Sequence, residues 1–242
     1  MVALATGAIH KAEALIRWRH PTRGLINPAE FIPIAEQTGM IMAIGEWVMQ
    51  QAVQQAHHWR RTIDPLFQVS VNMSPLQFQN FNISRSSCFE PCRALGQPSD
   101  CLDGELVVEI TEGLLLEASE VVTDQLNFFR DAGVQLSIDD FGTGYSSLSY
   151  LKKFHIDYLK IDQSFVLKMT GDSDDLALCE AIIVMCHKLG IKVIAEGVET
   201  REQRDLLTAA GCDYGQGYLF ARPVPVSEME ALLRKDVAAN PS

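Results

Sequence analysis

Short hydrophobic runs rich in β-branched residues alternate along this chain with longer segments in which apolar side chains recur at helical spacing. Strands and helices in regular alternation favour a parallel sheet or barrel that helices cover from outside. Several runs are apolar at nearly every position, as expected for strands that are covered on both faces. The predicted strands are Ala12–Trp18, Gln68–Asn72, Leu106–Ile110, Val134–Asp139, Tyr158–Ile161, Lys192–Ala195 and Gly217–Phe220.

Start and stop signals mark the intervening helices. A capping residue followed three positions later by Glu or Gln predicts a helix N-terminus, and a glycine after the last apolar position predicts a C-terminus. The start signals are Asn27-Pro28 with Glu30, Ser74-Pro75 with Gln77, Thr200 with Gln203, and Ser227 with Glu230. The stop signals are Gly39, Gly133, Gly190 and Gly211. Two apolar stripes predict core-facing helix surfaces, namely Trp47, Val48, Ala52, Ala56 and Trp59, and Leu178, Ile182, Met185 and Leu189.

The sequence predicts a single domain over residues 1–242. This length suits one α/β barrel, and no linker-like or low-complexity segment divides the chain. The stretch Asn80–Asp103 is predicted to hold a short or broken helix, because Pro91 interrupts it. The last residues, Val237–Ser242, are predicted to form a frayed tail.

The hydropathy of the chain indicates where the protein is located, and its net charge indicates which partners it can bind. No run approaches the roughly 18 consecutive apolar residues of a transmembrane helix, and Met1–Thr6 is too short for a signal peptide. We therefore predict no membrane insertion and a cytoplasmic location, alone or as part of a membrane-anchored parent. The net charge of −11 argues against a nucleic-acid polymer as partner. The cluster Cys88, Cys92 and Cys101 matches no common zinc-binding spacing and is interpreted as reduced thiols.

The residues that could carry chemistry stand at the ends of the predicted strands. In a parallel barrel all strand C-termini open on one face, so these side chains would converge there. Burying several acids together without counter-charge is prohibitive, so bound cations are expected. The residues are Asn72, Glu109, Asp139, Asp140, Lys160, Glu196 and Gln216, which we expect to open the last strand, with Glu13 inside the first.

The donor atoms also indicate the kind of cation. Carboxylate and amide oxygens without His or Cys favour Mg²⁺ or Mn²⁺ over Zn²⁺. The adjacent Asp139 and Asp140 suggest a carboxylate that bridges two metals, and metals about 4 Å apart suit in-line attack on a phosphodiester. Taken singly, each residue could instead be a turn former, a helix cap or a surface ion-pair partner. The joint pattern across six strands favours a site.

Longer motifs follow one another in a fixed order, and Asp139–Leu148 (DDFGTGYSSL) is the most specific of them. The others are Glu13–Pro21 (EALIRWRHP), Asn27–Pro33 (NPAEFIP), Val69–Asn72 (VSVN), Glu109–Glu112 (EITE), Leu159–Asp162 (LKID), Ala195–Thr200 (AEGVET) and Gln216–Tyr218 (QGY). Together they resemble the EAL domain, a family of cyclic-di-GMP phosphodiesterases. The resemblance implies a TIM-like (β/α)8 barrel with an antiparallel first strand. It also implies metal-dependent hydrolysis of cyclic-di-GMP to linear 5′-pGpG.

The resemblance further implies a role for each matching residue. Two divalent cations, Mg²⁺ or Mn²⁺ with Ca²⁺ inhibitory, would share Asp139, and their implied ligands are Glu13, Asn72, Glu109, Asp139, Asp140 and Glu196. The implied catalytic residues are Lys160, which would orient the attacking water, with Glu13, Asp139 and Glu196. The implied substrate-binding residues are Arg17, Gln216 and Tyr218. The implied loop-stabilising residues are Glu112, which would pin the loop after Asp140, and Glu199.

The chain departs from the family at its start. Met1–Leu4 matches only the end of a longer first strand, so we expect that strand to be largely missing and the chain to be truncated. The family implies a homodimer and attached sensory or GGDEF domains in a longer parent protein. Two other functions stay open: a module that binds cyclic-di-GMP without cutting it, and a glycosidase that uses two carboxylates. The Asp pair, Asn72 and Lys160 fit a metal-bound phosphate better than a sugar.

Overall fold

The computed structural model describes residues 1–80, 102, 104–116, 119–142, 144 and 148–239. Eight strands form one sheet, in the order β1-β10-β9-β8-β7-β6-β5-β2. Their bounds are β1 (Val2–Ala3), β2 (Lys11–Ala14), β5 (Gln68–Asn72), β6 (Leu106–Thr111), β7 (Gln135–Phe141), β8 (Tyr158–Ile161), β9 (Lys192–Ala195) and β10 (Tyr214–Gly215). A separate hairpin pairs β3 (Trp18–His20) with β4 (Gly24–Ile26).

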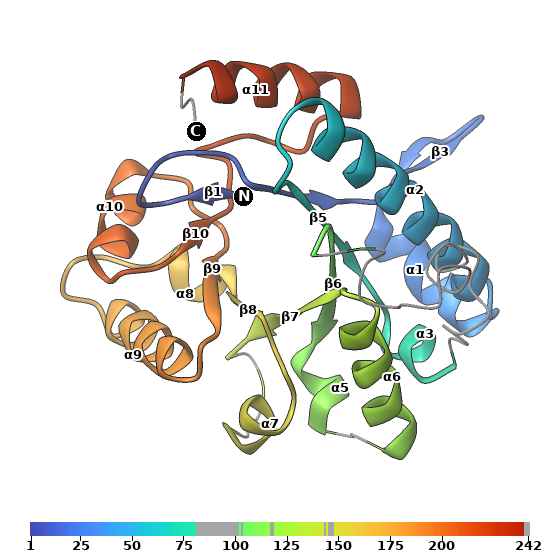
Figure 1. Cartoon of the computed structure of the whole chain (residues 1–242), viewed down its shortest axis with the longest axis horizontal. Helices are drawn as coiled ribbons and strands as arrows, with labels where there is room; N and C mark the ends of the chain where they lie inside the picture. Colours follow the sequence, from blue (N-terminus) through green and yellow to red (C-terminus); the bar gives the residue numbers. More distant parts are fainter. Residues whose placement is uncertain (81–101, 103, 117–118, 143, 145–147, 240–242) are drawn as a thin grey trace.

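The eight-stranded sheet curls into a nearly closed barrel, as Figure 1 shows. Every pairing from β2 round to β10 is parallel, whereas β1 runs antiparallel to β10. The two ends of the order, β1 and β2, follow one another in the chain, and an isolated bridge joins Val2 to Ile9. The predicted TIM-like barrel with an antiparallel first strand is therefore confirmed.

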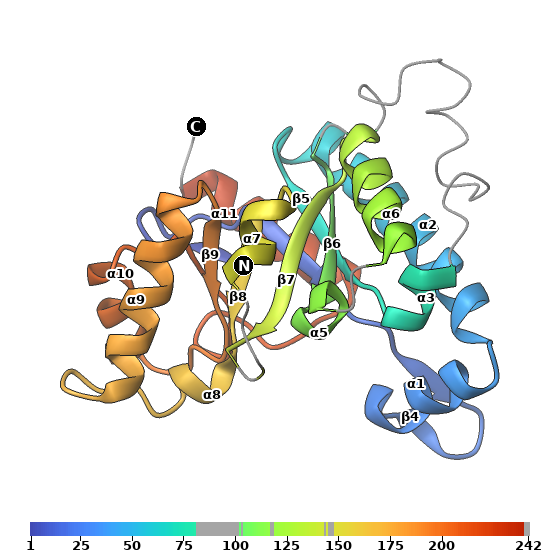
Figure 2. The same cartoon turned by 90° about the horizontal axis from the view of Figure 1, so that it is seen from below.

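Helices surround the barrel, and the hairpin with α1 stands away from it, as Figure 2 shows. Most of the apolar core lies between the sheet and these helices, because Val69 and Val71 of β5 and their counterparts point outward and are buried. The helices are α1 (Pro28–Gln37), α2 (Ile41–Thr62), α3 (Pro75–Asn80), α5 (Glu112–Leu116), α6 (Glu120–Asp131), α7 (Leu148–Lys153), α8 (Gln163–Val166), α9 (Asp174–Lys188), α10 (Arg201–Ala209) and α11 (Val226–Ala239).

Most of the predicted helix signals are confirmed. The Asn27 side chain caps α1, Thr200 and Gln203 form a complete capping box on α10, and the four glycine stop signals all have positive φ. Two signals were wrong. Glu30 forms an ion pair with Arg23 at 2.5 Å instead of completing a box, and α11 begins before Ser227, whose predicted partner Glu230 accepts a hydrogen bond from the Trp59 indole.

The two apolar stripes were only partly right. On α9 the buried face is formed by Leu176, Cys179, Ile183 and Cys186, whereas Leu178 and Leu189 are exposed. Buried cysteines act here as small apolar residues, which shifts the face by about one position from the Leu and Met pattern. On α2, Ala52, Ala56 and Trp59 are buried as predicted, but Trp47 is 54% exposed.

The last predicted strand was also wrong. Gly217–Phe220 forms a turn, and the strand is the preceding pair Tyr214–Gly215. The first predicted strand is shorter than expected, because β2 ends at Ala14 and Trp18 begins the hairpin. Residues 237–239 of the predicted tail are helical. The predicted broken helix and the Cys88, Cys92 and Cys101 cluster lie outside the described residues.

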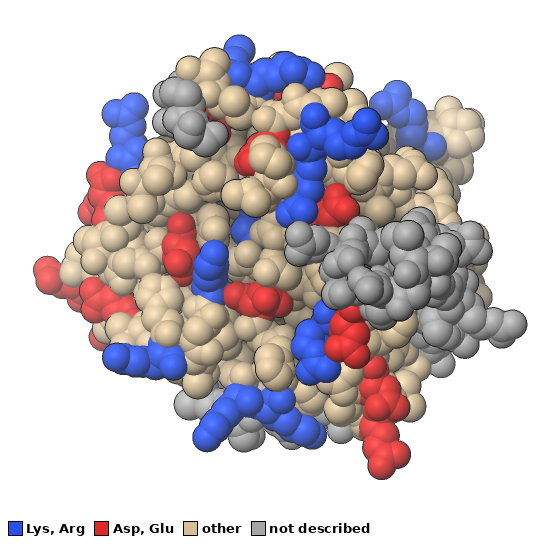
Figure 3. Space-filling model, viewed as in Figure 1, with Lys and Arg blue, Asp and Glu red and all other residues tan. Residues whose placement is uncertain are grey.

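The distribution of surface charge and the hydropathy of the helices can be compared with the charge and apolar content of the sequence. On the face seen in Figure 3, basic and acidic side chains are interspersed rather than gathered by sign. Within the described part of the chain, no helix combines the length and the apolar character needed to cross a membrane.

Gly217 tests how the turn after β10 is packed. A Cβ atom at this position would lie 2.2 Å from the carbonyl oxygen and 2.4 Å from the nitrogen of Val198. Backbone atoms cannot move aside cheaply, so Gly217→Ala should lower the free energy of unfolding by about 3 kcal/mol. Gly113→Ala is the matched control, because a Cβ there meets nothing within 4 Å. Chemical denaturation of both variants measures this, and equal stability would contradict the described turn.

Candidate active site

The residues predicted at the strand ends meet inside one end of the barrel. Paired residues of neighbouring parallel strands project to the same side, and the register pairs Asn72 with Glu109 and Thr111 with Asp139. Contacts among the side chains bring together Glu13, Asn72, Glu109, Asp139, Lys160, Glu196 and Gln216.

Lys160 is the buried cation at the centre of this group. Its Nζ lies 2.6 Å from Glu109 Oε2, 2.7 Å from Glu196 Oε1, 3.0 Å from Asp139 Oδ1 and 4.0 Å from Glu13 Oε2. The side chains of Lys160 and Glu109 are each 1% exposed. An ammonium group has three donors, and three carboxylates lie within 3.0 Å of it. Lys160 therefore supplies the counter-charge that lets these acids be buried together.

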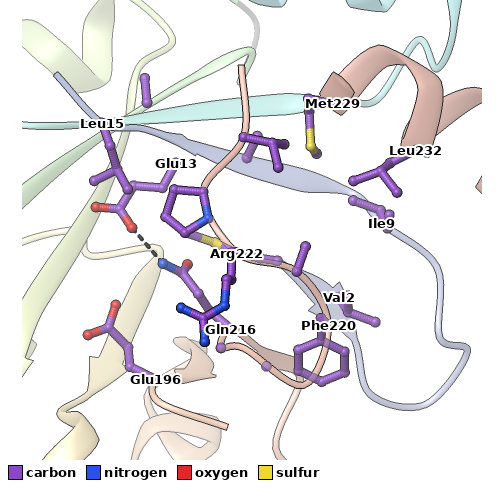
Figure 4. Close-up of a pocket in the computed structure, with 18 of the residues that line it drawn as sticks. Val2, Ile9, Glu13, Leu15, Glu196, Gln216, Phe220, Arg222, Met229 and Leu232 are labelled. Carbon is purple, nitrogen blue, oxygen red and sulfur yellow. Dashed lines mark hydrogen bonds between the residues drawn. The ribbon is translucent and has the colours of Figure 1, made fainter. Parts of the chain in front are cut away.

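Two amides hold Glu13 from both sides. Its Oε1 accepts from Asn72 Nδ2 and its Oε2 from Gln216 Nε2, each at 2.6 Å. Figure 4 shows the second of these bonds and places Glu196 beside the same end of the cavity. Gln216 does not open the last strand, as we had predicted. It directly follows β10 and so has the same strand-end position as the other site residues.

The electrostatic environment separates the carboxyl groups. Burial, together with the neighbouring acids, raises the pKa of Glu109 and of Glu196 to about 7, although Lys160 opposes the rise. Burial alone would also raise the pKa of Glu13, but Lys160 and the two amides hold it below its ordinary value. Burial would lower the pKa of Lys160, but the carboxylates outweigh it and hold that pKa well above the usual range. Lys160 is thus charged while two of its partners protonate near neutral pH.

Asp139 and Asp140 share a strained segment of β7. Asp140 has φ of 55°, in the left-handed region that few residues other than glycine adopt. The register with β8 shifts between Ile138 and Phe141, as at a β-bulge. Bulges and left-handed residues often re-aim side chains at functional sites. Here the bulge turns Asp140 so that one ligand atom each of Asp139, Asp140 and Glu196 lie within 4.8 Å of one another.

This donor set fits divalent cations of the Mg²⁺ class. Every candidate ligand atom is a carboxylate or amide oxygen, the donor type that Mg²⁺ and Mn²⁺ prefer. Gln216 Oε1 is buried beside Glu13 and accepts no hydrogen bond from the described residues, so it is free to meet an ion or its water.

The two residues predicted to stabilise the loop lie at the edge of the site. Glu112, the first residue of α5, accepts a hydrogen bond from the Gly142 backbone N–H at 3.5 Å and so contacts the segment after Asp140. Glu199 lines the cavity, and its backbone N–H is fixed by Gln203. Residues 143 and 145–147 of the loop are outside the described part of the chain.

A cavity of about 1730 Å³ opens beside the carboxylates. Arg17 and Tyr218, both predicted to contact substrate, line it and are exposed. The Arg222 guanidinium lies 4.3 Å above the Tyr218 ring, and sequence reasoning missed this residue. Figure 4 shows that Arg222 lies at the polar end of the cavity, whereas Met229 and neighbouring apolar side chains form the other end.

Sequence reasoning also missed polar residues that continue below the site inside the barrel. In β5 the side chains alternate, so that Gln68, Ser70 and Asn72 face inward while the valines between them face the helices. The same period of two gives Gln135, Ser137 and Asp139 in β7. This alternation of polar and apolar residues is the sequence signal that could have revealed them. It places the catalytic candidates at the last of several polar positions that face the inside of the barrel.

An α/β barrel that gathers five carboxylates and a buried lysine at the open end of its strands belongs to the class of barrel proteins with an oxygen-ligand site for divalent cations. The EAL domain family matches residues 1–223. The chain belongs to the EAL domain family.

Relatives and solved structures agree with this assignment. The chain is 41% identical to MucR of Pseudomonas aeruginosa, a bifunctional diguanylate cyclase/cyclic di-GMP phosphodiesterase, over 95% of this chain and 33% of MucR. It is 40% identical to the cyclic di-GMP phosphodiesterase NbdA of the same species, over 97% of this chain and 29% of NbdA. The chain thus spans about a third of the length of these curated relatives.

Two solved structures share the fold closely. The structure of the PaMucR phosphodiesterase in complex with c-di-GMP superimposes with a TM-score of 0.84 at 40% identity, covering 94% of this chain and 90% of that chain. The EAL enzyme Bd1971, bound to cAMP and cyclic-di-GMP, gives a TM-score of 0.85 at 34% identity, covering 96% and 62%.

Replacing Lys160 tests its role as counter-charge. In metal-free protein, Lys160→Met should lower the free energy of unfolding by about 3–5 kcal/mol, because it leaves buried carboxylates without a cation. Mn²⁺ should restore much of this loss, since the ion supplies the missing charge. Lys168→Met, at an exposed position, is the matched control and should change little. Thermal denaturation with and without EDTA measures both, and an unchanged Lys160→Met protein would contradict the assignment.

Proposed function

We propose that this chain hydrolyses cyclic-di-GMP to linear 5′-pGpG with two divalent cations, and so lowers the level of this second messenger. The observation that carries the proposal is the convergence of four carboxylates on Lys160, with Asn72 and Gln216 bonded to one of them, Glu13. The phosphodiesterase names of its relatives, and the cyclic-di-GMP bound to solved neighbours, support the choice of substrate.

The chain's own residues would divide the work between binding and orientation. Glu13, Asn72, Glu109 and Asp139 would hold one cation, and Asp139, Asp140 and Glu196 the other. Two such cations neutralise charge on the phosphate and lower the pKa of a bound water. Lys160 would hold the attacking water in line, and its high pKa keeps it in the charged form that this task needs. Glu13, Asp139 and Glu196 share the catalytic work by fixing the positions around that water.

The cavity wall offers contacts for an anionic dinucleotide. Arg17 can meet a phosphate, and Gln216 can hold a water that reaches the substrate. The exposed Tyr218 ring, with Arg222 above it, presents a flat surface on which a guanine can stack. A protein of net charge −11 repels a dinucleotide at long range, so local positive charge at the site has to overcome that repulsion.

The setting of the domain is also part of the proposal. The relatives are about three times longer than this chain, which supports attached sensory or GGDEF domains in a parent protein. We place the domain in the cytoplasm, as a homodimer in which Glu112 and Glu199 stabilise the loop after Asp140. The alternative is a catalytically silent module that binds cyclic-di-GMP without cutting it. This alternative is disfavoured because every implied metal-ligand position holds the expected residue.

Incubation of the purified chain with cyclic-di-GMP and Mn²⁺, with chromatography of the products, tests the proposed reaction. We expect 5′-pGpG from the wild type and none with EDTA. Glu13→Gln keeps the shape of the side chain but removes a ligand charge, and should reduce the rate by about 100-fold or more. Glu180→Gln, exposed on α9, is the matched control. Nucleotide binding without product in the wild type would favour the silent module.

The raised pKa of Glu109 and of Glu196 predicts pH-dependent metal binding. Burial raises both to about 7, so below that pH a cation must displace a proton from each carboxyl group. At pH 6 this should weaken binding about tenfold per carboxyl group, and about 100-fold in total, relative to pH 8. Calorimetric titration of the metal-free chain with Mn²⁺ at both pH values measures the difference. Equal affinities would contradict the prediction.

A further inference from the structure

Two buried serines lie inside the barrel directly below the carboxylate group. Ser70 of β5 is 2% exposed and Ser137 of β7 is fully buried. Neither hydroxyl has a hydrogen-bond partner among the described residues. A buried polar atom left in this state costs about 1–3 kcal/mol, so two on adjacent levels of one barrel interior require a physical explanation.

The strand register places each serine next to a glutamate of the site. Ser137 is paired with Glu109 on the neighbouring strand β6, and Ser70 is paired with Glu13 on β2. Paired residues on adjacent parallel strands lie about 4.8 Å apart and face the same way. The glutamates point inward to Lys160, so both serine hydroxyls point into the barrel beneath them.

Glu109 supplies a third atom in the same condition. Its Oε2 accepts from Lys160 at 2.6 Å, but its Oε1 is buried without a hydrogen-bond partner. A carboxylate offers about four lone-pair positions, so Glu109 can contact a cation on one side and accept a hydrogen bond on another. The Met1 amine is also buried inside the barrel near Glu13 and Glu109, where it donates to the Lys11 carbonyl at 2.7 Å. Tyr158, which is paired with Ser137, turns its hydroxyl away to Gln68 and Gln135.

We propose that Ser137, Ser70 and Glu109 bind ordered water beneath the carboxylate group, and that this water positions Glu109. Buried waters typically make about three hydrogen bonds to polar atoms that otherwise have no partner, and Ser70 Oγ, Ser137 Oγ and Glu109 Oε1 are three such atoms. A water donating to Glu109 Oε1 would fix the rotation of the carboxylate and so the direction of its other oxygen. Ser70 and Ser137 are positioning residues in this proposal. Their effect on metal binding rests on the proposed function, whereas the water site itself does not.

Replacing the serines gives a change of opposite sign under the two explanations. If water bridges Ser137 to Glu109, Ser137→Ala breaks the bridge and should lower the Tm of the metal-free protein by about 2–4 °C. If the hydroxyl has no partner, its removal should leave Tm unchanged or raise it. Ser70→Ala should behave in the same way. Ser164→Ala, exposed at the start of α8, is the matched control and should change nothing.

Metal affinity then tests the positioning role separately. We expect Ser137→Ala to weaken Mn²⁺ binding about tenfold, as substitutions behind a metal ligand commonly do, and Ser137→Thr, which keeps the hydroxyl, to restore most of it. A lower Tm with unchanged Mn²⁺ affinity would overturn the positioning role. A Tm that stays equal or rises in both alanine variants would overturn the water site. Neither result depends on whether the chain hydrolyses cyclic-di-GMP.

Discussion

The active end of this barrel depends on one ion arrangement: a single ammonium group buried among carboxylates. Desolvation of so many acids would be prohibitive without it, and three of the four carboxylates lie within 3.0 Å of Lys160. The parallel sheet makes this possible, because the site residues stand at or near the C-terminal ends of strands that all open on one end of the barrel. The bulge in β7 adds Asp140 to the group at a φ of 55°. Backbone strain and charge are thus concentrated at one face, while the helices outside carry the apolar packing.

The inside of the barrel is polar for most of its depth. Lys11, Gln68, Gln135 and Tyr158 form a hydrogen-bonded layer at the far end, in which Lys11 Nζ lies 3.2 Å from the centre of the Tyr158 ring. Burial lowers the pKa of Lys11 to about 6, so this lysine tends to be neutral, in contrast to Lys160. Next to this layer, Val107, Tyr158 and Ile194 form a small buried apolar cluster. The two buried lysines differ because several carboxylates contact Lys160 directly, whereas burial and the nearby Lys192 outweigh the attraction of Asp157 and Glu109 for Lys11.

The features that could be predicted from the sequence are those that depend on neighbouring residues in the chain. The strands Gln68–Asn72, Tyr158–Ile161 and Lys192–Ala195 were predicted to the residue, because a run of β-branched residues between clear breakers leaves little freedom. Gly217–Phe220 was wrong because close approach to Val198 turns the chain there, and no local pattern reveals that contact. The buried face of α9 was wrong because its cysteines pack as apolar residues. The site residues converge as predicted. The sequence could not predict three tertiary features: the number of carboxylates that contact Lys160, the bulge at Asp140, and the stacking of Arg222 on Tyr218.

Charge balance supports the two cations of the proposed function over a single one. When all are ionised, the five carboxylates of Glu13, Glu109, Asp139, Asp140 and Glu196, with the single ammonium of Lys160, leave a net charge of −4. Two divalent cations balance this charge, whereas one would leave a buried excess. Without cations the protein reduces the excess by protonation, which is what the pKa of about 7 for Glu109 and for Glu196 reflects. Cations would replace those protons and compete with Lys160 for the same oxygens. The lysine that balances the carboxylates in the metal-free protein would then have fewer carboxylate partners, and its charge would be available for a water beside the phosphate.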